Sequence, residues 1–318
     1  MPATAQVHER KHRIDFKQIL LATDFSDASR RALDYAIVLA KRYHSALSIV
    51  HAIPPDPHAP APIYPLPREL DRVRLAAERQ IKEINVDARI SELNHRVLVE
   101  RGPVWDVLAS EIQRENVELL VLGTRGRGGL KKLALGSIAE TVLHQARCPV
   151  LTIGPNVPAA DSKTTAFKHI LFATDFAPLS AKAFPYALSL AEDYQAQLVL
   201  LHMVTPMPIA DLGPTSYCPG PFAAESLLKW QETARQESAK ALRTLLPADA
   251  NLAARPVYLV GLDFVPEGVL EVAAAHKAEL IVMGAMRTRS PRMAAHFPWN
   301  LTHEVIARAT CPVLTVCN

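Results

Sequence analysis

The strongest constraint on the fold is that the chain contains the same pattern of residues twice. Residues 19–25 (ILLATDF) return as residues 170–176 (ILFATDF), and residues 118–123 (ELLVLG) return as residues 279–284 (ELIVMG). A long internal repeat of this kind indicates two copies of one folding unit. The length of 318 residues is also that expected of two domains. We therefore predict two domains of the same fold, joined head to tail.

Each copy begins with a short apolar run followed at once by polar residues, which is typical of a buried strand in a parallel sheet. A helix with one apolar face is predicted after this strand in both copies. That face comprises Ala32, Leu33, Ala36, Ile37 and Ala40 in the first copy and Ala183, Phe184, Ala187, Leu188 and Ala191 in the second. Ser26 is placed to cap the first helix, and Pro185 is expected to kink the second.

Strands and helices continue to alternate, so each copy is predicted to contain five strands. Parallel neighbours need crossover connections, and this order therefore predicts helices on both faces of the sheet. The predicted fold class is α/β, with two tandem doubly wound domains, each on a five-stranded parallel-type sheet. We place a flexible tail at residues 1–15, the first domain at 16–154, a linker at 155–167 and the second domain at 168–318.

Charge and composition exclude several classes of protein. A net charge of +3 is too small to indicate a nucleic-acid surface. No apolar run approaches the roughly 18 residues of a membrane-spanning helix. The four cysteines form no CxxC pair, so we expect a protein of the reducing cytoplasm. Cys148 and Cys311 are predicted to be buried, whereas Cys218 and Cys317 are predicted to be more accessible.

The loop at residues 123–137 of the first copy is the best candidate for a binding site. It follows the fourth predicted strand, and ligands collect at the carboxyl ends of the strands in an open doubly wound sheet. Its glycines let the backbone approach an anion, and the helix predicted to open at Gly136 and Ser137 offers unpaired amides. Arg125 and Arg127 add positive charge that favours a triphosphate. On composition alone, a mobile basic surface loop remains the alternative.

At this loop the sequence resembles the universal stress protein family, whereas neither a P-loop nor the GxGxxG fingerprint fits the glycine spacing. Nucleotide-binding members carry a glycine, two residues, a glycine, nine residues, and a glycine followed by Ser or Thr. Gly123, Gly126, Gly136 and Ser137 meet this spacing. Residues 22–26 (ATDFS) and 148–150 (CPV) strengthen the resemblance, which spans nearly the whole chain, as in tandem members. It implies an adenine nucleotide alpha hydrolase-like fold.

The resemblance also implies the ligand and the residues that hold it. Asp24 and the backbone of Ala52 are expected to hold adenine, with Ala22 beside them, while Leu122 and Gly123 lie near the ribose. The expected ligand is ATP, with magnesium bridging its phosphates. The residues expected to receive the phosphates are Gly126, Gly136, Ser137 and Ile138. Arg125 and Arg127 are not implied by the resemblance and are included for their positive charge. The full predicted site comprises Ala22, Thr23, Asp24, Ala52, Leu122, Gly123, Arg125, Gly126, Arg127, Gly136, Ser137 and Ile138.

The second copy departs from this pattern at the phosphate end. One alignment places Phe297 at the position of Gly136, and another places Trp299 there. On either alignment a bulky ring replaces the glycine, so ordinary nucleotide binding is predicted to be blocked. We interpret this half as a structural or regulatory partner whose pocket is filled by Phe297, Trp299 or Met286. Binding of a different ligand in this half stays open.

The leading hypothesis is an ATP-binding, stress-response regulatory protein. A nucleotide-independent scaffold or chaperone-like dimer is the alternative. A third hypothesis is an enzyme that turns over nucleotide. It would be at most a slow ATPase, because no GxSxG, HExxH or serine–histidine–acid arrangement occurs. No catalytic or metal-binding residue is assigned, and His51 and His202 are interpreted as satisfied core histidines. The resemblance also implies that residues 150–153 pair with residues 313–316 in an internal pseudo-dimer, and a homodimer of two chains is plausible.

Overall fold

The computed structural model describes residues 13–55, 67–85, 87–124, 135–160, 166–204, 221–285 and 299–317. The strands of the first half are β1 (Gln18–Ala22), β2 (Ala46–Ile53), β3 (His95–Arg101), β4 (Leu119–Gly123) and β5 (Val150–Ile153). Its helices are α1 (Asp27–Tyr43), α2 (Pro67–Asn85), α3 (Ala88–Ser91), α4 (Val104–Arg114) and α5 (Ser137–Gln145).

The second half repeats this order. Its strands are β6 (His169–Ala173), β7 (Gln197–Val204), β8 (Val257–Leu262), β9 (Leu280–Gly284) and β10 (Val313–Val316). Its helices are α6 (Pro178–Tyr194), α7 (Pro221–Leu245), α8 (Val265–Ala275) and α9 (Trp299–Arg308). The predicted fold class, two doubly wound α/β units in tandem, is confirmed.

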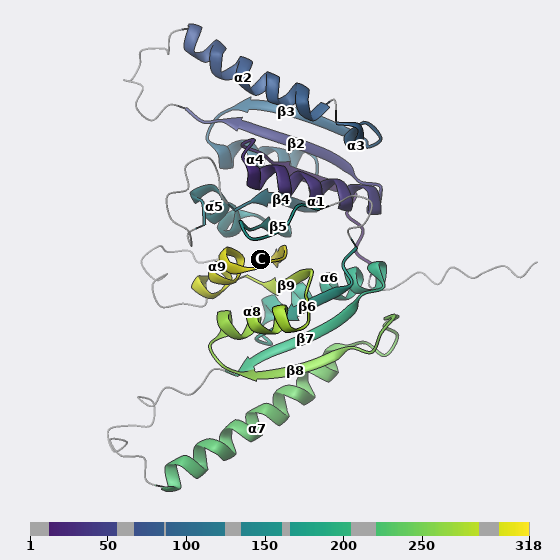
Figure 1. Ribbon diagram of the computed structural model, residues 1–318, viewed down its shortest axis with the longest axis vertical. Coiled ribbons are helices and arrows are strands. Elements are labelled where there is room, and N and C mark those ends of the chain that lie inside the picture. The colour runs from purple at the N-terminus through teal and green to yellow at the C-terminus, as the bar shows by residue number, and fades with distance from the viewer. Residues whose placement is uncertain are drawn as a thin grey trace, which may run out of the picture.

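The described strands form one ten-stranded sheet in the order β3-β2-β1-β4-β5-β10-β9-β6-β7-β8, which runs through the whole molecule in Figure 1. Neighbouring strands within each half are parallel, whereas β5 and β10 are antiparallel, with Leu151 opposite Leu314. The pairing of residues 150–153 with 313–316 within one chain is therefore confirmed. In each half the strand order reverses beside the first strand, between β1 and β4 or between β6 and β9.

Two apolar layers, one on each face of the sheet, fix the helices. The buried residues of α1 and α6 belong to one layer, and those of α4, α5, α8 and α9 belong to the other. The predicted apolar face of α1 is buried, because Ala32, Ala36, Ile37 and Ala40 have no exposed surface. Ser26 accepts a hydrogen bond from the Ser29 amide and so caps α1 as predicted. The helix α6 continues through Pro185 for 17 residues.

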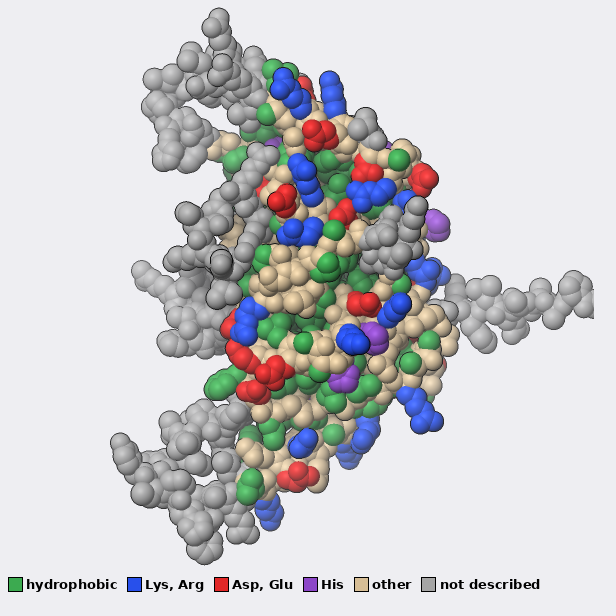
Figure 2. Space-filling view, viewed as in Figure 1, with side chains coloured by type: hydrophobic (Ala, Val, Ile, Leu, Met, Phe, Trp, Pro, Cys, Tyr) green, Lys and Arg blue, Asp and Glu red, His purple; other side chains and the backbone are tan. Residues whose placement is uncertain are grey.

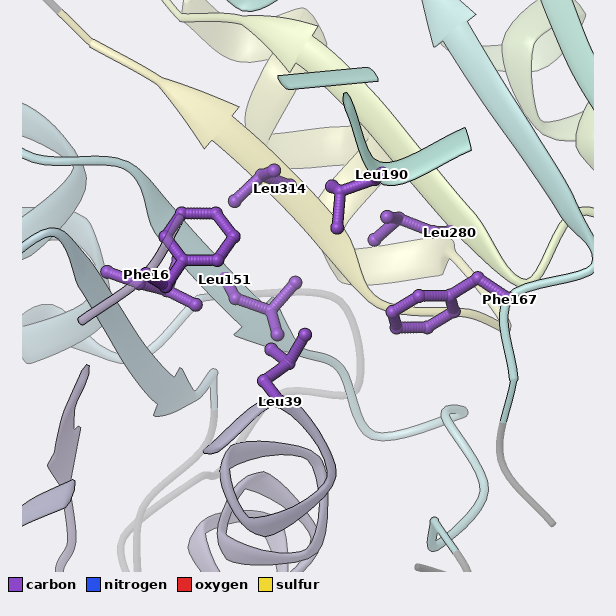
Figure 3. A pocket seen from close by; sticks show the side chains of 8 residues that line it. Phe16, Leu39, Leu151, Phe167, Leu190, Leu280 and Leu314 are labelled. Atoms are coloured by element: carbon purple, nitrogen blue, oxygen red, sulfur yellow. The ribbon is translucent and has the colours of Figure 1, made fainter. Parts of the chain in front are cut away.

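The two halves share one core across the β5–β10 seam. A cavity of about 10 Å³ lies at the seam. Its lining side chains, which Figure 3 shows from close by, come in equivalent pairs from the two halves. These side chains are Phe16, Leu39, Leu119, Leu151, Phe167, Leu190, Leu280 and Leu314. The segments that precede β1 and β6 cross between halves, since Phe16 stacks on Tyr186 at 6.2 Å and Phe167 stacks on Tyr35 at 6.5 Å between ring centroids.

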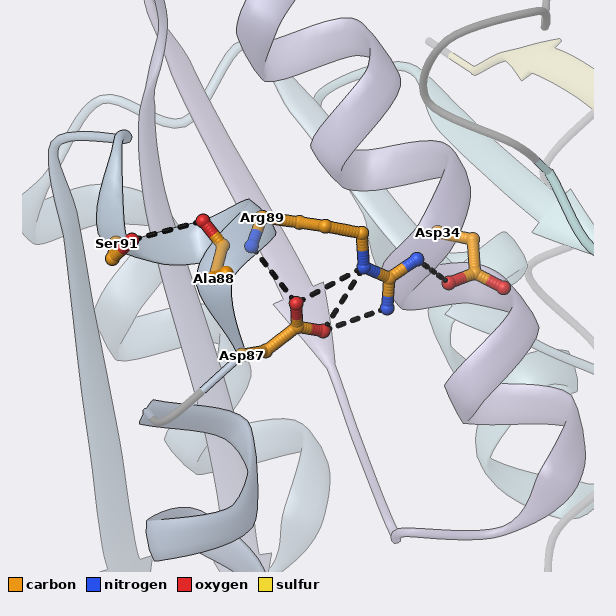
Figure 4. A network of polar contacts seen from close by, with 5 residues as sticks. All are labelled: Asp34, Asp87, Ala88, Arg89 and Ser91. Atoms are coloured by element: carbon orange, nitrogen blue, oxygen red, sulfur yellow. Dashed lines mark hydrogen bonds and ion pairs between the residues drawn. The ribbon is translucent and has the colours of Figure 1, made fainter.

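Polar contacts position the short helix α3, which the sequence analysis does not predict. Arg89 of α3 lies 2.7 Å from Asp34 of α1 and 2.7 Å from Asp87, the N-cap of α3 (Figure 4). Asp34 has no ionisable counterpart in α6, because Pro185 occupies that position. The ion pairs therefore hold α3 against the α1 face in the first half alone.

The cysteine predictions are partly wrong. Cys148 and Cys311 are buried as predicted, and burial raises the pKa of each thiol to about 12. Cys317 was expected to be accessible, but it is only 8% exposed and its Sγ lies 3.4 Å from the Leu143 carbonyl oxygen. It is buried because the residue that follows β10 packs against α5 of the other half. Cys218 lies outside the described residues.

Two observations concern the nucleic-acid-binding and membrane-spanning classes that the sequence argues against. Lys and Arg side chains are interspersed with Asp and Glu over the face shown in Figure 2, as the small net charge of +3 implies. Among the described helices, none is long and apolar enough to cross a bilayer.

Candidate functional site

The turn between β1 and α1 is held by hydrogen bonds within the TDF sequence itself. The Thr23 amide donates to the Val50 carbonyl oxygen at 2.9 Å, which ties the end of β1 to β2. The Phe25 amide donates to Thr23 Oγ1 at 3.1 Å, and the Ser26 amide donates to Asp24 Oδ1 at 3.0 Å. Phe25 has a φ of 61°, in the left-handed region that a bulky residue rarely adopts. These bonds fix the Asp24 carboxylate at the end of β1.

His51 completes this turn from the neighbouring strand. Its Nδ1 lies 2.8 Å from the Thr23 carbonyl oxygen, and its ring lies 4.5 Å from the ring of Phe25. His51 is therefore hydrogen-bonded as predicted, but it is half-buried and does not lie in the core. Ala52, the next residue, packs with Ala22 against the apolar layer on the α5 side of the sheet. Asp24 and Ala52 therefore lie at adjacent strand ends.

The end of β4 lies close to α1. A Cβ placed on Gly123 would stand 2.7 Å from the carbonyl carbon of Ala28 in α1, so this position has no space for a side chain. Thr124 then joins three elements, since its amide donates to the Ile153 carbonyl oxygen at 3.0 Å and its carbonyl accepts from the Gly136 amide at 2.8 Å. In the glycine motif of the sequence, Thr124 is only a spacer between Gly123 and Gly126.

Gly136 is the N-cap of α5 and makes no side-chain capping bond. The first turn of a helix leaves backbone amides without intrahelical partners, and the helix dipole makes this end positive. Ser137 is exposed, and Ile138 is 39% exposed. The first turn of α5 thus offers donors at an accessible surface, fastened through Thr124 to the end of β4. Such an arrangement is suited to an anion.

The predicted site residues that the structure describes lie at the carboxyl edge of the sheet. They are Ala22, Thr23 and Asp24 at the end of β1, Ala52 in β2, Leu122 and Gly123 in β4, and Gly136, Ser137 and Ile138 at the start of α5. Arg125, Gly126 and Arg127 lie outside the described residues. A cavity of about 310 Å³ lies at the same edge, lined by Ile53, Glu78, Val99 and Arg101. Among the described side chains, no group of three His, Cys, Asp or Glu is placed to hold a metal ion.

The second half reproduces the β1–α1 turn. The Thr174 amide donates to Leu201 at 2.9 Å, the Phe176 amide donates to Thr174 Oγ1 at 3.0 Å, and His202 Nδ1 lies 2.8 Å from the Thr174 carbonyl oxygen. His202 is thus hydrogen-bonded as predicted, and like His51 it is half-buried. The Asp175 carboxylate also accepts a hydrogen bond from Ser180 Oγ, which lies 2.6 Å from its Oδ1.

The phosphate end of the second half is built differently. The helices α5 and α9 each end three residues before their Cys-Pro pair, so the alignment counted back from Cys311 applies to them. It places Trp299, the first residue of α9, at the position of Gly136. Ala285 stands at the position of Thr124, and its amide donates to the Val316 carbonyl oxygen at 3.0 Å. Phe297 and Met286 lie outside the described residues.

The model of the universal stress protein family matches residues 15–154 and again residues 166–316. The chain belongs to the universal stress protein family. Among the family's single-unit members, universal stress protein YxiE of Bacillus subtilis is 31% identical over 147 residues, which are 43% of this chain and 99% of that protein. Universal stress protein A homolog 1 of Coxiella burnetii is 34% identical over 145 residues, which are 43% of this chain and 96% of that protein.

A solved structure of the family covers both halves of the chain. The crystal structure of a universal stress protein from Archaeoglobus fulgidus covers 96% of this chain and 99% of its own, with a TM-score of 0.62 and 19% identity. Another universal stress protein, solved in complex with cAMP, covers 48% of this chain with a TM-score of 0.29 and 20% identity. The bound cAMP is an observation on that protein.

Proposed function

We propose that the first half of this universal stress protein binds ATP in a stress response, while the second half serves as its structural or regulatory partner. The observation that carries the proposal is the link from β4 through Thr124 to Gly136 and the start of α5. It brings an accessible helix N-terminus to the carboxyl edge of the sheet, where ligands of doubly wound folds collect.

The residues at the two ends of this edge suit the two ends of ATP. At the β1–β2 end, the Asp24 carboxylate is oriented by the Ser26 amide at 3.0 Å and is suited to accept hydrogen bonds from a base or ribose. At the α5 end, backbone amides and the helix dipole favour phosphate. Magnesium bound to the phosphate oxygens would neutralise part of their charge there.

Stoichiometry tests the proposal. Calorimetry with ATP and magnesium should give about one site per chain. Gly136→Trp, which copies Trp299 of the second half, should abolish that site by filling the space before α5. Gln145→Trp, at the exposed opposite end of the same helix, is the matched control and should leave binding unchanged. Two sites per chain would contradict the assignment of the second half.

The absence of binding would support the other functional hypothesis. A chain that purifies without adenine nucleotide, and gains no thermal stability from ATP, would be a nucleotide-independent scaffold. Hydrolysis is no part of the proposal: ATP is proposed to select a conformation or a partner. Phosphate release well above background that depended on Asp24 or Ser137 would replace this proposal with an enzyme.

A further inference from the structure

The hydroxyl of Thr124 is a buried polar group without a partner. Thr124 is 1% exposed, and within the described part of the chain its Oγ1 has no hydrogen-bond partner. Its backbone is fully used, because the amide bonds to Ile153 and the carbonyl bonds to Gly136. A buried hydroxyl left unpaired costs about 1–3 kcal/mol. Such a group in a folded protein calls for an explanation.

Other buried threonines of the sheet make the contrast clear. Thr152 Oγ1 donates to the Val313 carbonyl oxygen at 3.0 Å, and Thr315 Oγ1 donates to that of Val150 at 3.2 Å. Thr174 Oγ1 accepts from the Phe176 amide at 3.0 Å. These hydroxyls all have protein partners, so the fold satisfies buried threonines readily. Among the four buried threonines compared, only Thr124 has an unpaired hydroxyl within the described part of the chain.

The alternation of side chains along β4 shows which face the Thr124 side chain occupies. Leu122 belongs to the apolar layer that includes α5, and a Cβ on Gly123 would point at Ala28 of α1 on the opposite face. Successive side chains of a strand alternate between faces. Thr124 continues this alternation onto the α5 face, and its carbonyl holds Gly136, the cap of that helix. Its hydroxyl therefore lies beneath the first turn of α5.

The second half lacks this hydroxyl. Ala285 stands at the equivalent position and makes the same backbone bond to the strand beside it, at 3.0 Å in both halves. The backbone geometry of the fold thus does not require a threonine there. The hydroxyl occurs in the half that has Gly136 before the helix and is missing from the half that has Trp299.

We propose that the Thr124 hydroxyl donates a hydrogen bond to a phosphate oxygen of the nucleotide held at the start of α5. This inference rests on the proposed function and adds to it a residue that discriminates phosphorylated ligands from the bare nucleoside. A hydroxyl donor to a charged oxygen forms one of the stronger hydrogen bonds in proteins. The ligand supplies the acceptor that the protein does not.

Thr124→Val tests the inference because valine keeps the shape and removes only the hydroxyl. We expect ATP affinity to fall about 10- to 100-fold, as for the loss of a hydrogen bond to a charged group. Adenosine affinity should not change, because adenosine has no phosphate. Without ligand, the melting temperature of the variant should be equal to or above that of the wild type, since an unpaired buried hydroxyl has been removed. Thr124→Ser should retain ATP binding.

Thr152→Val is the matched control, because it removes a buried hydroxyl that has a partner. It should lower the melting temperature and leave the ratio of ATP to adenosine affinity unchanged. The inference falls if Thr124→Val binds ATP as the wild type does, or weakens adenosine as much as ATP. The wild type separates the two proposals: if it binds ATP and Thr124→Val does too, only this inference fails, and if it binds no ATP, the proposed function fails with it.

Discussion

The two halves of the molecule have the same turn at one end of the candidate site and different chemistry at the other. The Thr-Asp-Phe turn and its histidine have nearly equal distances in both, with 2.8 Å from each histidine Nδ1 to a threonine carbonyl and 4.5 Å between each Phe–His ring pair. At the helix that follows the fourth strand, Gly136 in one half corresponds to Trp299 in the other.

This comparison separates residues that stabilise the fold from residues that suit a ligand. A feature present in both halves, such as the turn around Asp24 and Asp175, is explained by the fold alone. A feature confined to the half with an open helix N-terminus, such as the Thr124 hydroxyl, is not. Substitutions at paired positions test this division.

The largest effect is expected at the glycines that end β4 and β9. A Cβ on Gly123 would lie 2.7 Å from backbone of α1, and one on Gly284 would lie 2.7 Å from backbone of α6. Gly123→Val and Gly284→Val should each lower the free energy of unfolding by about 3 kcal/mol or more, because a whole helix must shift. Urea denaturation measures this. A large loss at Gly123 alone would show that the fold does not require both glycines.

The second effect concerns a polar cluster that only the first half contains. Glu111 of α4 is completely buried and pairs with Arg96 at 2.7 Å, while Arg96 also donates to Ser48 at 2.8 Å. The sheet register places Val257 at the position of Arg96, and Val272 stands at that of Glu111. The second half thus fills the same space with apolar side chains.

Arg96→Val should cost about 2–3 kcal/mol of unfolding free energy, because the buried Glu111 carboxylate loses one of its two arginine partners and keeps only Arg114, at 2.5 Å. The double variant Arg96→Val, Glu111→Val copies the second half and should recover most of that loss. Chemical denaturation of the two single variants and the double variant completes the cycle. Additive losses would mean that the two halves do not tolerate the same apolar packing at this position.

Most of the fold could be predicted from the sequence because the repeat records it twice. A strand or helix supported by two independent runs, such as residues 19–25 and 170–176, leaves little ambiguity. The short helix α3 was missed because four residues carry no helical period and its position depends on the ion pairs of Arg89 with two aspartates. Cys317 was misjudged because its burial depends on a helix more than 170 residues earlier.

The candidate site could be predicted only in part. Glycine spacing identified Gly123 and Gly136, since the need for a close backbone approach is visible in residue type. Thr124 was missed because a threonine at the end of a strand is explained by its strand propensity alone. That its hydroxyl is buried without a hydrogen-bond partner can be seen only in the folded structure. Whether Phe297 or Trp299 corresponds to Gly136 could be decided only from the structure, by comparing where α5 and α9 end.

The third effect is a loss of stability in acid that arises at the seam between the halves. His144 of α5 and His303 of α9 lie with ring centroids 6.1 Å apart. Burial, followed by the neighbouring His144, lowers the pKa of His303 from 6.5 to about 4. Burial also lowers the pKa of His144, although Glu140 on the same helix opposes this shift. The equivalent of His303 in the first half is Glu140, which is exposed.

The folded protein therefore keeps His303 neutral where the unfolded chain takes up a proton. The stabilisation is complete above the unfolded pKa and is lost as the pH falls from 6.5 towards about 4. We expect a loss of about 1–2 kcal/mol over this range, because solvent screens part of the effect. His303→Gln should flatten this part of the profile in denaturant titrations at several pH values. An unchanged slope in the variant would assign the acid sensitivity to other groups.

The smallest effect is expected at Lys41 of α1, whose counterpart in α6, Glu192, serves as the comparison. Lys41 pairs with Glu92 at 3.0 Å, but the Glu92 side chain is 74% exposed, so Lys41→Ala should change the unfolding free energy by about 0.5 kcal/mol or less. Glu192, its counterpart, is 5% exposed and accepts from the Asn251 amide at 2.7 Å, so Glu192→Ala should cost about 1–3 kcal/mol. Denaturation of both variants measures the difference. Equal costs would contradict the argument that burial, rather than position in the repeat, decides what a polar contact contributes.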